Sequence, residues 1–245
     1  LIDNYINNVS RSPNDLVWTA RAAGALEKFH DANDLFKLAT QSNPRNAEAF
    51  LAWADLLVGR ADEPEVIAAY QDVLKIDPNM PEANLGMAKV FAYTTPERAA
   101  GALEKAMTTN PNFVDGHLFM AEQSIDSEQY DKAQEQIAKA LADNPKSNEA
   151  VSQLASIAFF KNNKADFEKY VRQVLDTNPN YSELYNILAE SSIRIRLYKE
   201  AVDFARQSLL INPRDWDAMS ILGINLMRIG EEDAGKAALQ KAFAG

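Results

Sequence analysis

The sequence predicts an all-α fold, a solenoid of about seven helical hairpins stacked in line, and three observations support this prediction. An Asn-Pro or Asp-Pro pair that would end a helix recurs at a nearly constant interval. Each interval holds two apolar stripes at helical spacing, and a small residue returns at the same place in the first stripe. Self-similarity with a period of roughly 20 to 50 residues is typical of repeat proteins.

The spacing of six prolines is the strongest of these signals. They follow one another at intervals of 34, 33, 34, 34 and 34 residues. The pairs are Asn43-Pro44, Asp77-Pro78, Asn110-Pro111, Asn144-Pro145, Asn178-Pro179 and Asn212-Pro213. Proline disfavours helical geometry in the residue before it and cannot donate to the helical ladder, so we expect each pair to end a helix.

An acidic residue lies four positions after each of these prolines, in the first turn of the next predicted helix. The six residues are Glu48, Glu82, Asp115, Glu149, Glu183 and Asp217. The free N–H groups and the positive dipole end of a helix both favour a carboxylate there. We therefore interpret these acids as structural, with ligand binding as the alternative.

Two columns of residues are predicted to form the core. The first helices carry a column of small residues: Ala20, Ala54, Ala88, Ala121, Ala155, Ala189 and Gly223. The second helices carry another: Ala39, Val73, Ala106, Ala140, Val174, Ser208 and Ala242. Because small side chains let neighbouring helices approach closely, we expect both columns to be buried.

These marks divide the chain into units near residues 13–46, 47–80, 81–113, 114–147, 148–181, 182–215 and 216–245. Their first helices should begin near Pro13, Ala47, Pro81, Val114, Asn148, Ser182 and Trp216. Residues 1–12 are predicted to form a packing helix, because their apolar residues share one helical face. The chain stops at Gly245 without a polar capping helix, so we expect a piece of a longer protein.

The pattern resembles the tetratricopeptide repeat (TPR) family through its period, its helix-ending proline and its small column. Three segments add to the likeness: Phe29-His30-Asp31-Ala32, Tyr130-Asp131-Lys132-Ala133 and Tyr198-Lys199-Glu200-Ala201. The fifth unit departs from the pattern, with Phe167 where alanine stands in these segments. The resemblance implies a right-handed α–α superhelix whose first helices line a concave face that binds a protein or peptide. TPR domains that grip acidic chaperone tails use lysine and asparagine there, and the apolar and mixed residues of this chain predict no such clamp.

Charge and composition narrow the classes of partner. With 35 acidic and 25 basic residues the chain carries a net charge of −10, which would repel a phosphate backbone or an anionic lipid surface. We therefore expect no nucleic-acid partner. The sequence has no run of about 18 apolar residues, so we expect no direct membrane insertion. The absence of cysteine leaves a cytoplasmic or a periplasmic localisation equally open.

The sequence carries no motif for catalysis, for a cofactor or for a metal. His30 and His117 are its two histidines and lie in different units, so we interpret them as surface or packing residues. There is no glycine-rich phosphate loop, no Gly-x-Ser-x-Gly turn and no cysteine nucleophile. We therefore expect a protein that is not an enzyme and has no cofactor.

The inner face of the first helices is the predicted binding surface. One column there runs Val17, Leu51, Leu85 and Leu118, then Ser152, Asn186 and Ser220. Four residues on, a second column runs Arg21, Asp55, Lys89 and Glu122, then Ser156, Glu190 and Ile224. We interpret the alternating charges as lateral ion pairs worth about 0 to 1 kcal/mol each. The apolar column should supply the affinity, unless it packs between neighbouring first helices, which is the alternative.

Four further residues complete the predicted surface. Phe159 and Phe160 add aromatic area near the middle of the chain, although one of the two can belong to the core. Arg194 and Arg228 should make the C-terminal part of the groove more basic, which would suit an acidic ligand end. These residues and the charges above are expected to set specificity.

The leading hypothesis is a non-catalytic scaffold that binds a protein or peptide on this face. Self-association through the uncapped C-terminal edge is one alternative. The other is the repeat arm of a larger bacterial enzyme, because the run from Gly230 to Lys236 resembles bacterial TPR arrays that precede a zinc-peptidase-like domain.

Overall fold

The computed structural model describes residues 12–26 and 28–244, and every helix or strand assigned within them is an α-helix. The first helices of the hairpins are α2 (Pro13–Ala25), α4 (Ala47–Leu57), α6 (Pro81–Phe91), α8 (Val114–Asp126), α10 (Asn148–Phe160), α12 (Glu183–Arg194) and α14 (Trp216–Arg228). The second helices are α3 (Phe29–Ser42), α5 (Glu63–Ile76), α7 (Pro96–Thr109), α9 (Tyr130–Asp143), α11 (Lys164–Thr177), α13 (Tyr198–Ile211) and α15 (Glu232–Ala244). The helix expected over residues 1–12 falls outside the described residues, apart from Ser12.

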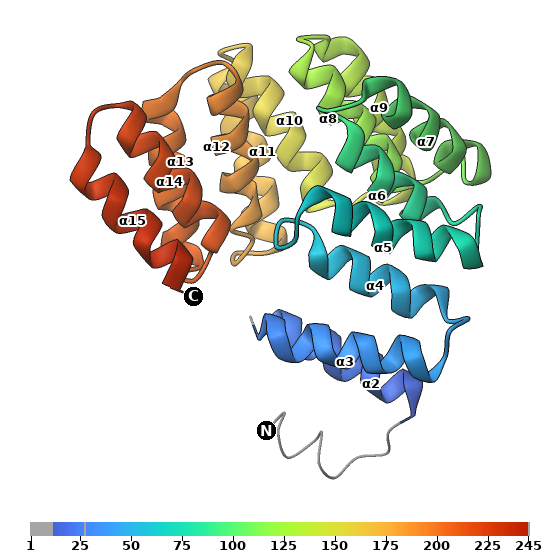
Figure 1. Cartoon of the computed structure of the whole chain (residues 1–245). Coiled ribbons are helices and arrows are strands. Elements are labelled where there is room, and N and C mark those ends of the chain that lie inside the picture. The colour runs from blue at the N-terminus through green and yellow to red at the C-terminus, as the bar shows by residue number, and fades with distance from the viewer. Residues whose placement is uncertain (1–11, 27, 245) are drawn as a thin grey trace. The chain divides into compact units, whose positions relative to one another are not determined.

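The helices form two compact units, Leu1–Gly116 and His117–Gly245. In the first unit α2, α4 and α6 each pack against their second helices α3, α5 and α7, and α2 also contacts α4 while α4 contacts α6. In the second unit α10, α12 and α14 pack against α11, α13 and α15, and α12 contacts both α10 and α14. Figure 1 shows these hairpins as successive helix pairs. Within each unit the first helices therefore form one row.

The observed first helices begin close to the residues named from the sequence. Six of them start at the residue named from the sequence, and α12 starts one residue later, at Glu183. Four carry a side-chain cap, in which Ser12, Asn46, Ser147 and Asp215 accept a hydrogen bond from the N–H three residues on. The acid four residues after each proline lies in the first turn, as the dipole argument requires.

In the Asn-Pro and Asp-Pro pairs, side-chain hydrogen bonds as well as the proline end the second helices. Each Asn or Asp side chain accepts a hydrogen bond of 3.0 to 3.3 Å from the N–H two residues on. Each of these residues also donates its own N–H to the carbonyl four residues back, which belongs to the buried column of the second helix. The turn is therefore closed by a local side chain that tolerates non-helical geometry, as Asn and Asp do elsewhere.

Both predicted core columns are buried. The alanines of the first column have no exposed surface, and Gly223 is buried as well. In the second column the residues from Ala39 to Ser208 have none either, and Ala242 is partly buried. A Cβ added at Gly223 would lie 2.6 Å from Cγ of Leu239 and 3.0 Å from the carbonyl oxygen of Gly235, so α14 and α15 cross too closely for a side chain there.

The turns inside the hairpins use left-handed backbone. In the second unit this position is held by Glu128, Asn162, Arg196 and Gly230, with φ of 57°, 52°, 63° and 90°. Each of these residues donates its N–H to the carbonyl three residues back at 2.9 to 3.2 Å. Three of these four turns therefore place a side chain where glycine is the preferred residue.

Candidate functional site

The apolar column of the first helices is mostly buried. Val17, Leu85 and Leu118 are 8%, 4% and 1% exposed, whereas Leu51 is partly buried. Their burial favours the packing alternative, because a side chain without accessible surface offers a ligand no apolar area to cover. The expected role of these three residues in ligand affinity is therefore corrected to a role in packing.

The charged column of the first unit stays at the surface. Arg21, Asp55 and Lys89 are exposed, and the positive charges of Lys89 and Arg21 act on the Asp55 carboxylate. Oδ1 of Asp55 accepts a 2.8 Å hydrogen bond from Tyr70, and the partial loss of solvent on that side raises the pKa of Asp55 in spite of the positive charges. Among the described residues, no ion pair within 4.0 Å joins Asp55 to either base, so the expected ladder acts at longer range there.

Arg194 is the centre of charge in the second unit. Its guanidinium pairs with Glu122 at 2.8 Å and with Asp126 at 2.5 Å, and its side chain is 29% exposed. Glu122 lies 72 residues away on α8. Ser156 on α10, which is fully buried, lines the same cavity as Glu122 and Arg194. The expectation of a more basic groove at Arg194 is therefore corrected, because its charge is offset by two carboxylates.

A cavity of about 220 Å³ lies beside Arg194, on the row formed by α8, α10 and α12. Four carboxylates line it, those of Glu122, Glu149, Glu183 and Glu190. Arg194 is the one base among its lining residues, and Gln153, Ser156 and Ser191 supply neutral polar groups. We call this the acidic cavity. Two of its four carboxylates, Glu149 and Glu183, belong to the acids interpreted from the sequence as structural.

Glu190 is the most perturbed carboxyl of the acidic cavity. Although its outer side is exposed, crowding by protein atoms raises its pKa to about 7. The negative charges of Glu122, Glu183 and Asp217 add to this shift, and Arg194 opposes it. The pKa of Glu183 is raised as well, first by burial and then by the charges of Asp215 and Asp217. The cavity therefore holds more negative charge than its own base can offset.

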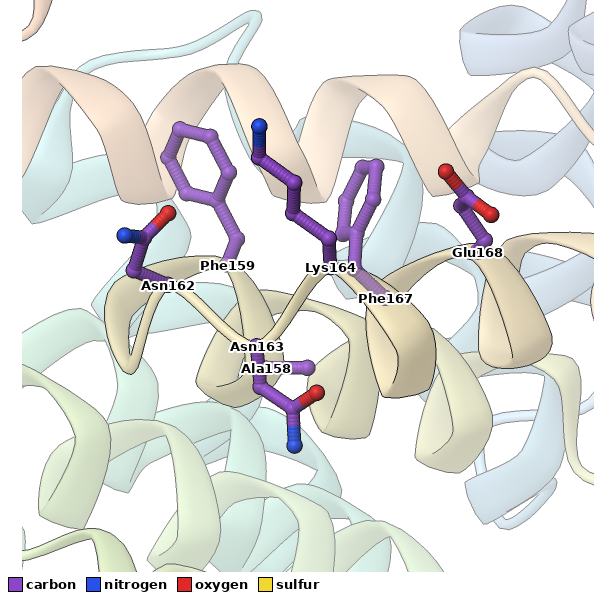
Figure 2. Close-up of a pocket in the computed structure, with 7 residues that line it drawn as sticks. All are labelled: Ala158, Phe159, Asn162, Asn163, Lys164, Phe167 and Glu168. Atoms are coloured by element: carbon purple, nitrogen blue, oxygen red, sulfur yellow. The ribbon is translucent and has the colours of Figure 1, made fainter.

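The rings of Phe159 and Phe160, at the end of α10, contact rings on second helices. The Phe159 ring lies 5.9 Å from Phe167 and 5.4 Å from Phe204, both on second helices, and Phe160 stacks on Tyr130 at 5.8 Å. Figure 2 shows Phe159 and Phe167 pointing to the same side of the turn between α10 and α11, where they line a pocket of about 320 Å³. The two phenylalanines therefore belong to the packing against second helices, which corrects their expected place.

Arg228 contacts one aromatic ring and one amide. Its guanidinium carbon is 5.1 Å from the centre of the Tyr198 ring, and Nη1 donates a 3.1 Å hydrogen bond to Asn225. Cation–π contact and hydrogen bond hold it at the end of α14, beside the turn before α13. The expectation that Arg228 makes the C-terminal part of the groove more basic stays a prediction.

The described residues contain neither a metal-binding cluster nor a membrane helix. His117 is buried, with Nδ1 2.8 Å from Oε1 of Gln136, and His30 is exposed beside the Phe29 ring. Within residues 12–26 and 28–244, no three His, Cys, Asp or Glu side chains are placed to share a metal ion. No helix in that part of the chain combines the length and the apolar character needed to cross a bilayer.

Comparison with known families settles what the repeated hairpins are. One sequence model of the tetratricopeptide repeat matches residues 19–89, and another matches residues 90–157 and 124–191. Together they cover well over half of the chain. The chain belongs to the tetratricopeptide repeat family. No curated relative matches the sequence of this TPR protein.

Solved structures share the fold of this TPR protein at low sequence identity. A tetratricopeptide repeat protein from Parabacteroides merdae matches with a TM-score of 0.57 and 15% identity, over 96% of this chain and 93% of its own. A chain of the Cut9–Hcn1 hetero-tetramer of APC/C matches with a TM-score of 0.61 and 17% identity, over 95% of this chain and 45% of its own. PilF of Pseudomonas aeruginosa matches with a TM-score of 0.53 and 15% identity, over 80% of this chain and 90% of its own. These likenesses show the all-α helical-repeat fold.

Sequence reasoning missed several residues of the acidic cavity of this TPR protein. Gln153 and Ser191 fall outside the two columns, and nothing in the repeat marks them. Glu149 and Glu183 are predicted from the sequence to interact with helix dipoles, and both lie in the first turn of a helix. The same two residues also line the acidic cavity. The one available signal was Ser156, a short residue in a column that otherwise carries charge at Glu122 and Glu190.

Proposed function

We propose that the protein is a non-catalytic scaffold that binds a peptide or protein segment along its first helices. Tetratricopeptide repeats generally mediate interactions between proteins, which gives the class of function. The acidic cavity carries the proposal, because it recesses the row of first helices and concentrates charge there. A recess with a few converging polar groups is the usual form of a recognition site.

Charge rather than apolar area should dominate recognition on this surface. Of the apolar column in the first unit, Leu51 alone keeps part of its surface, so covering it would contribute at most about 1.5 to 3 kcal/mol. The exposed side chains of Arg21, Asp55 and Lys89 instead offer alternating charges. Such charges select among partners and fix their register more than they add affinity.

Selection from a displayed library of random linear peptides on the whole chain tests the proposal. We expect enriched peptides whose affinity falls when a first-helix charge is changed, as in Lys89→Glu or Glu190→Gln. Matched changes of exposed residues on second helices, Lys105→Glu and Glu200→Gln, should leave the affinity unchanged. Failure of any peptide to enrich, or equal losses in both sets of variants, would contradict binding along the first helices.

Self-association at the C-terminal edge gains no support from α15. Among its described side chains, residues 232–242, no large apolar residue is exposed. The exposed positions there include Asp233, Lys236 and Lys241, whose charges oppose a dry contact. Light scattering over a concentration series checks this, with a constant monomer mass as the expected result.

A further inference from the structure

The acidic cavity contains a buried hydrogen-bond acceptor that lacks a donor. Gln153 is 6% exposed and lines the cavity, and its Nε2 donates a 3.2 Å hydrogen bond to the carbonyl of Leu118. That bond fixes the orientation of the amide, because a backbone carbonyl can face only its NH₂ group. Among the described residues nothing donates to the buried Oε1 of Gln153. An amide oxygen in this state favours a ligand that brings a donor.

The carboxylates of the cavity are only partly balanced. Arg194 pairs with Glu122 and Asp126. Glu183 and Glu190 have no base within ion-pair distance among the described residues, and Glu183 has the Asn186 amide at 3.3 Å as its neutral partner. Negative charge therefore lines a recess of about 220 Å³ whose wall includes Gln153, the residue with the unpaired acceptor.

From this geometry we infer that the acidic cavity holds one basic side chain, lysine or arginine, of a partner polypeptide. The inference rests on the proposed function, since it names the chemistry of the segment that the first helices bind. An ammonium group has three donors and a guanidinium five, and neither is an acceptor, so both suit a recess of carboxylates and an amide oxygen. An anionic group would be repelled, and an apolar group would leave Oε1 of Gln153 unpaired.

The titration of Glu190 is consistent with this occupant. Burial, together with Glu122, Glu183 and Asp217, raises its pKa, and Arg194 alone among the named neighbours opposes the shift. A second cation would oppose it further and lower the pKa. Within the described residues, no three His, Cys, Asp or Glu side chains are arranged to hold a metal ion.

A double-mutant cycle on the whole chain tests the inference. Peptides enriched by display are remade with norleucine in place of each lysine, or citrulline in place of each arginine, and titrated against the wild type, Glu190→Gln and Glu200→Gln. One basic position should lose about tenfold or more in affinity when neutralised, as expected for a charge-assisted contact. The same loss should appear in Glu200→Gln but shrink in Glu190→Gln, since the partner charge is then gone.

Two further probes are a small polyamine, which distinguishes a free cation from a basic side chain, and a second variant in the cavity. Spermidine that binds as tightly as the peptides would overturn a polypeptide ligand. Gln153→Met keeps the volume of the side chain but removes its acceptor, and it should weaken the basic peptide more than the neutral one. If it does not fold, the exposed substitution Glu190→Gln still decides the question.

The outcomes distinguish this inference from the function beneath it. Enriched peptides without a basic position, or equal losses in all three proteins, would overturn the basic occupant and leave a peptide-binding scaffold. A chain that enriches no peptide at all would overturn both.

Discussion

The Tyr70 hydroxyl donates a 2.8 Å hydrogen bond to Oδ1 of Asp55 and so joins a buried second-helix ring to a charge at the surface. Tyr70 is 3% exposed, and burial together with the Asp55 charge raises its pKa, so the phenol remains a donor in neutral solution. Its ring lies against Gly86 of α6, where an added Cβ would be 2.3 Å from two ring carbons. Gly86 therefore makes the contact possible.

Replacing Gly86 with alanine should displace that ring and break the bond to Asp55. We expect the free energy of unfolding to fall by about 1 to 3 kcal/mol, because overpacking outweighs the better helix propensity of alanine. Gly101→Ala on α7 is the control, since a Cβ there meets nothing within 4 Å. That variant should gain up to about 1 kcal/mol. Denaturant unfolding measures both, and equal gains would refute the close contact.

The left-handed turn at Arg196 predicts a stabilising substitution. Its φ of 63° disfavours a residue with a Cβ, and Gly230 holds the corresponding position in the next hairpin. Arg196→Gly should raise the free energy of unfolding by about 0.5 to 1 kcal/mol after the greater unfolded-state entropy of glycine is deducted. Asn162→Gly should gain less, because asparagine tolerates φ of 52°. A larger gain at Asn162 than at Arg196 would contradict this account.

Glu190 should make stability depend on pH. Its pKa is about 7 in the folded chain and 4.5 ordinarily, so the folded state binds the extra proton between these values. The free energy of unfolding therefore falls as the pH rises from 4.5 to about 7, and above that range it no longer depends on this group. Relative to the wild type, Glu190→Gln should be more stable at about pH 8 than at about pH 4. A pH-independent difference would contradict the raised pKa.

Arg194 offers an independent check on the same group. Its positive charge lowers the pKa of Glu190, so Arg194→Met should raise that pKa further. The carboxyl carbon of Glu190, followed by NMR through the titration, reports the value directly. Lys199→Met, at an exposed site on α13, serves as the control and should leave it unchanged.

Ala155 tests the core column of the first helices. It has no exposed surface, so Ala155→Leu should overpack a helix crossing and cost about 1 to 3 kcal/mol. Ala237→Leu, at an exposed position of α15, should change the free energy of unfolding by less than about 0.5 kcal/mol. A loss at Ala155 no larger than that at Ala237 would mean that the first helices approach one another less closely.

The sequence predicted the fold because its signals are local. A proline, the Asn or Asp before it and an acid four residues later specify where one helix ends and the next begins, without reference to the rest of the chain. The alanine column is nearly as direct, since Ala20 and Ala155 recur at the same place in the period. Family models and structural likeness confirm the helical repeat.

The binding surface was harder to predict because helical periodicity has an angular resolution of about 100° per residue. A position such as Leu85 or Leu118 lies at the edge between the neighbouring helix and the open face, and the crossing of the two helices decides its burial. Arg194 shows a second difficulty, because its partner Glu122 is 72 residues distant in the sequence. No spacing rule relates side chains two hairpins apart.

Ser156 has a consequence for how this protein family can change. Its hydroxyl is fully enclosed, donating to the Ser152 carbonyl and accepting from Ser191, and Ser156 and Arg194 line the same cavity. This short side chain lines the recess together with Gln153 and Ser191. A longer side chain at this position would project into the recess, so chains with the same scaffold can differ in the depth of the recess by one residue.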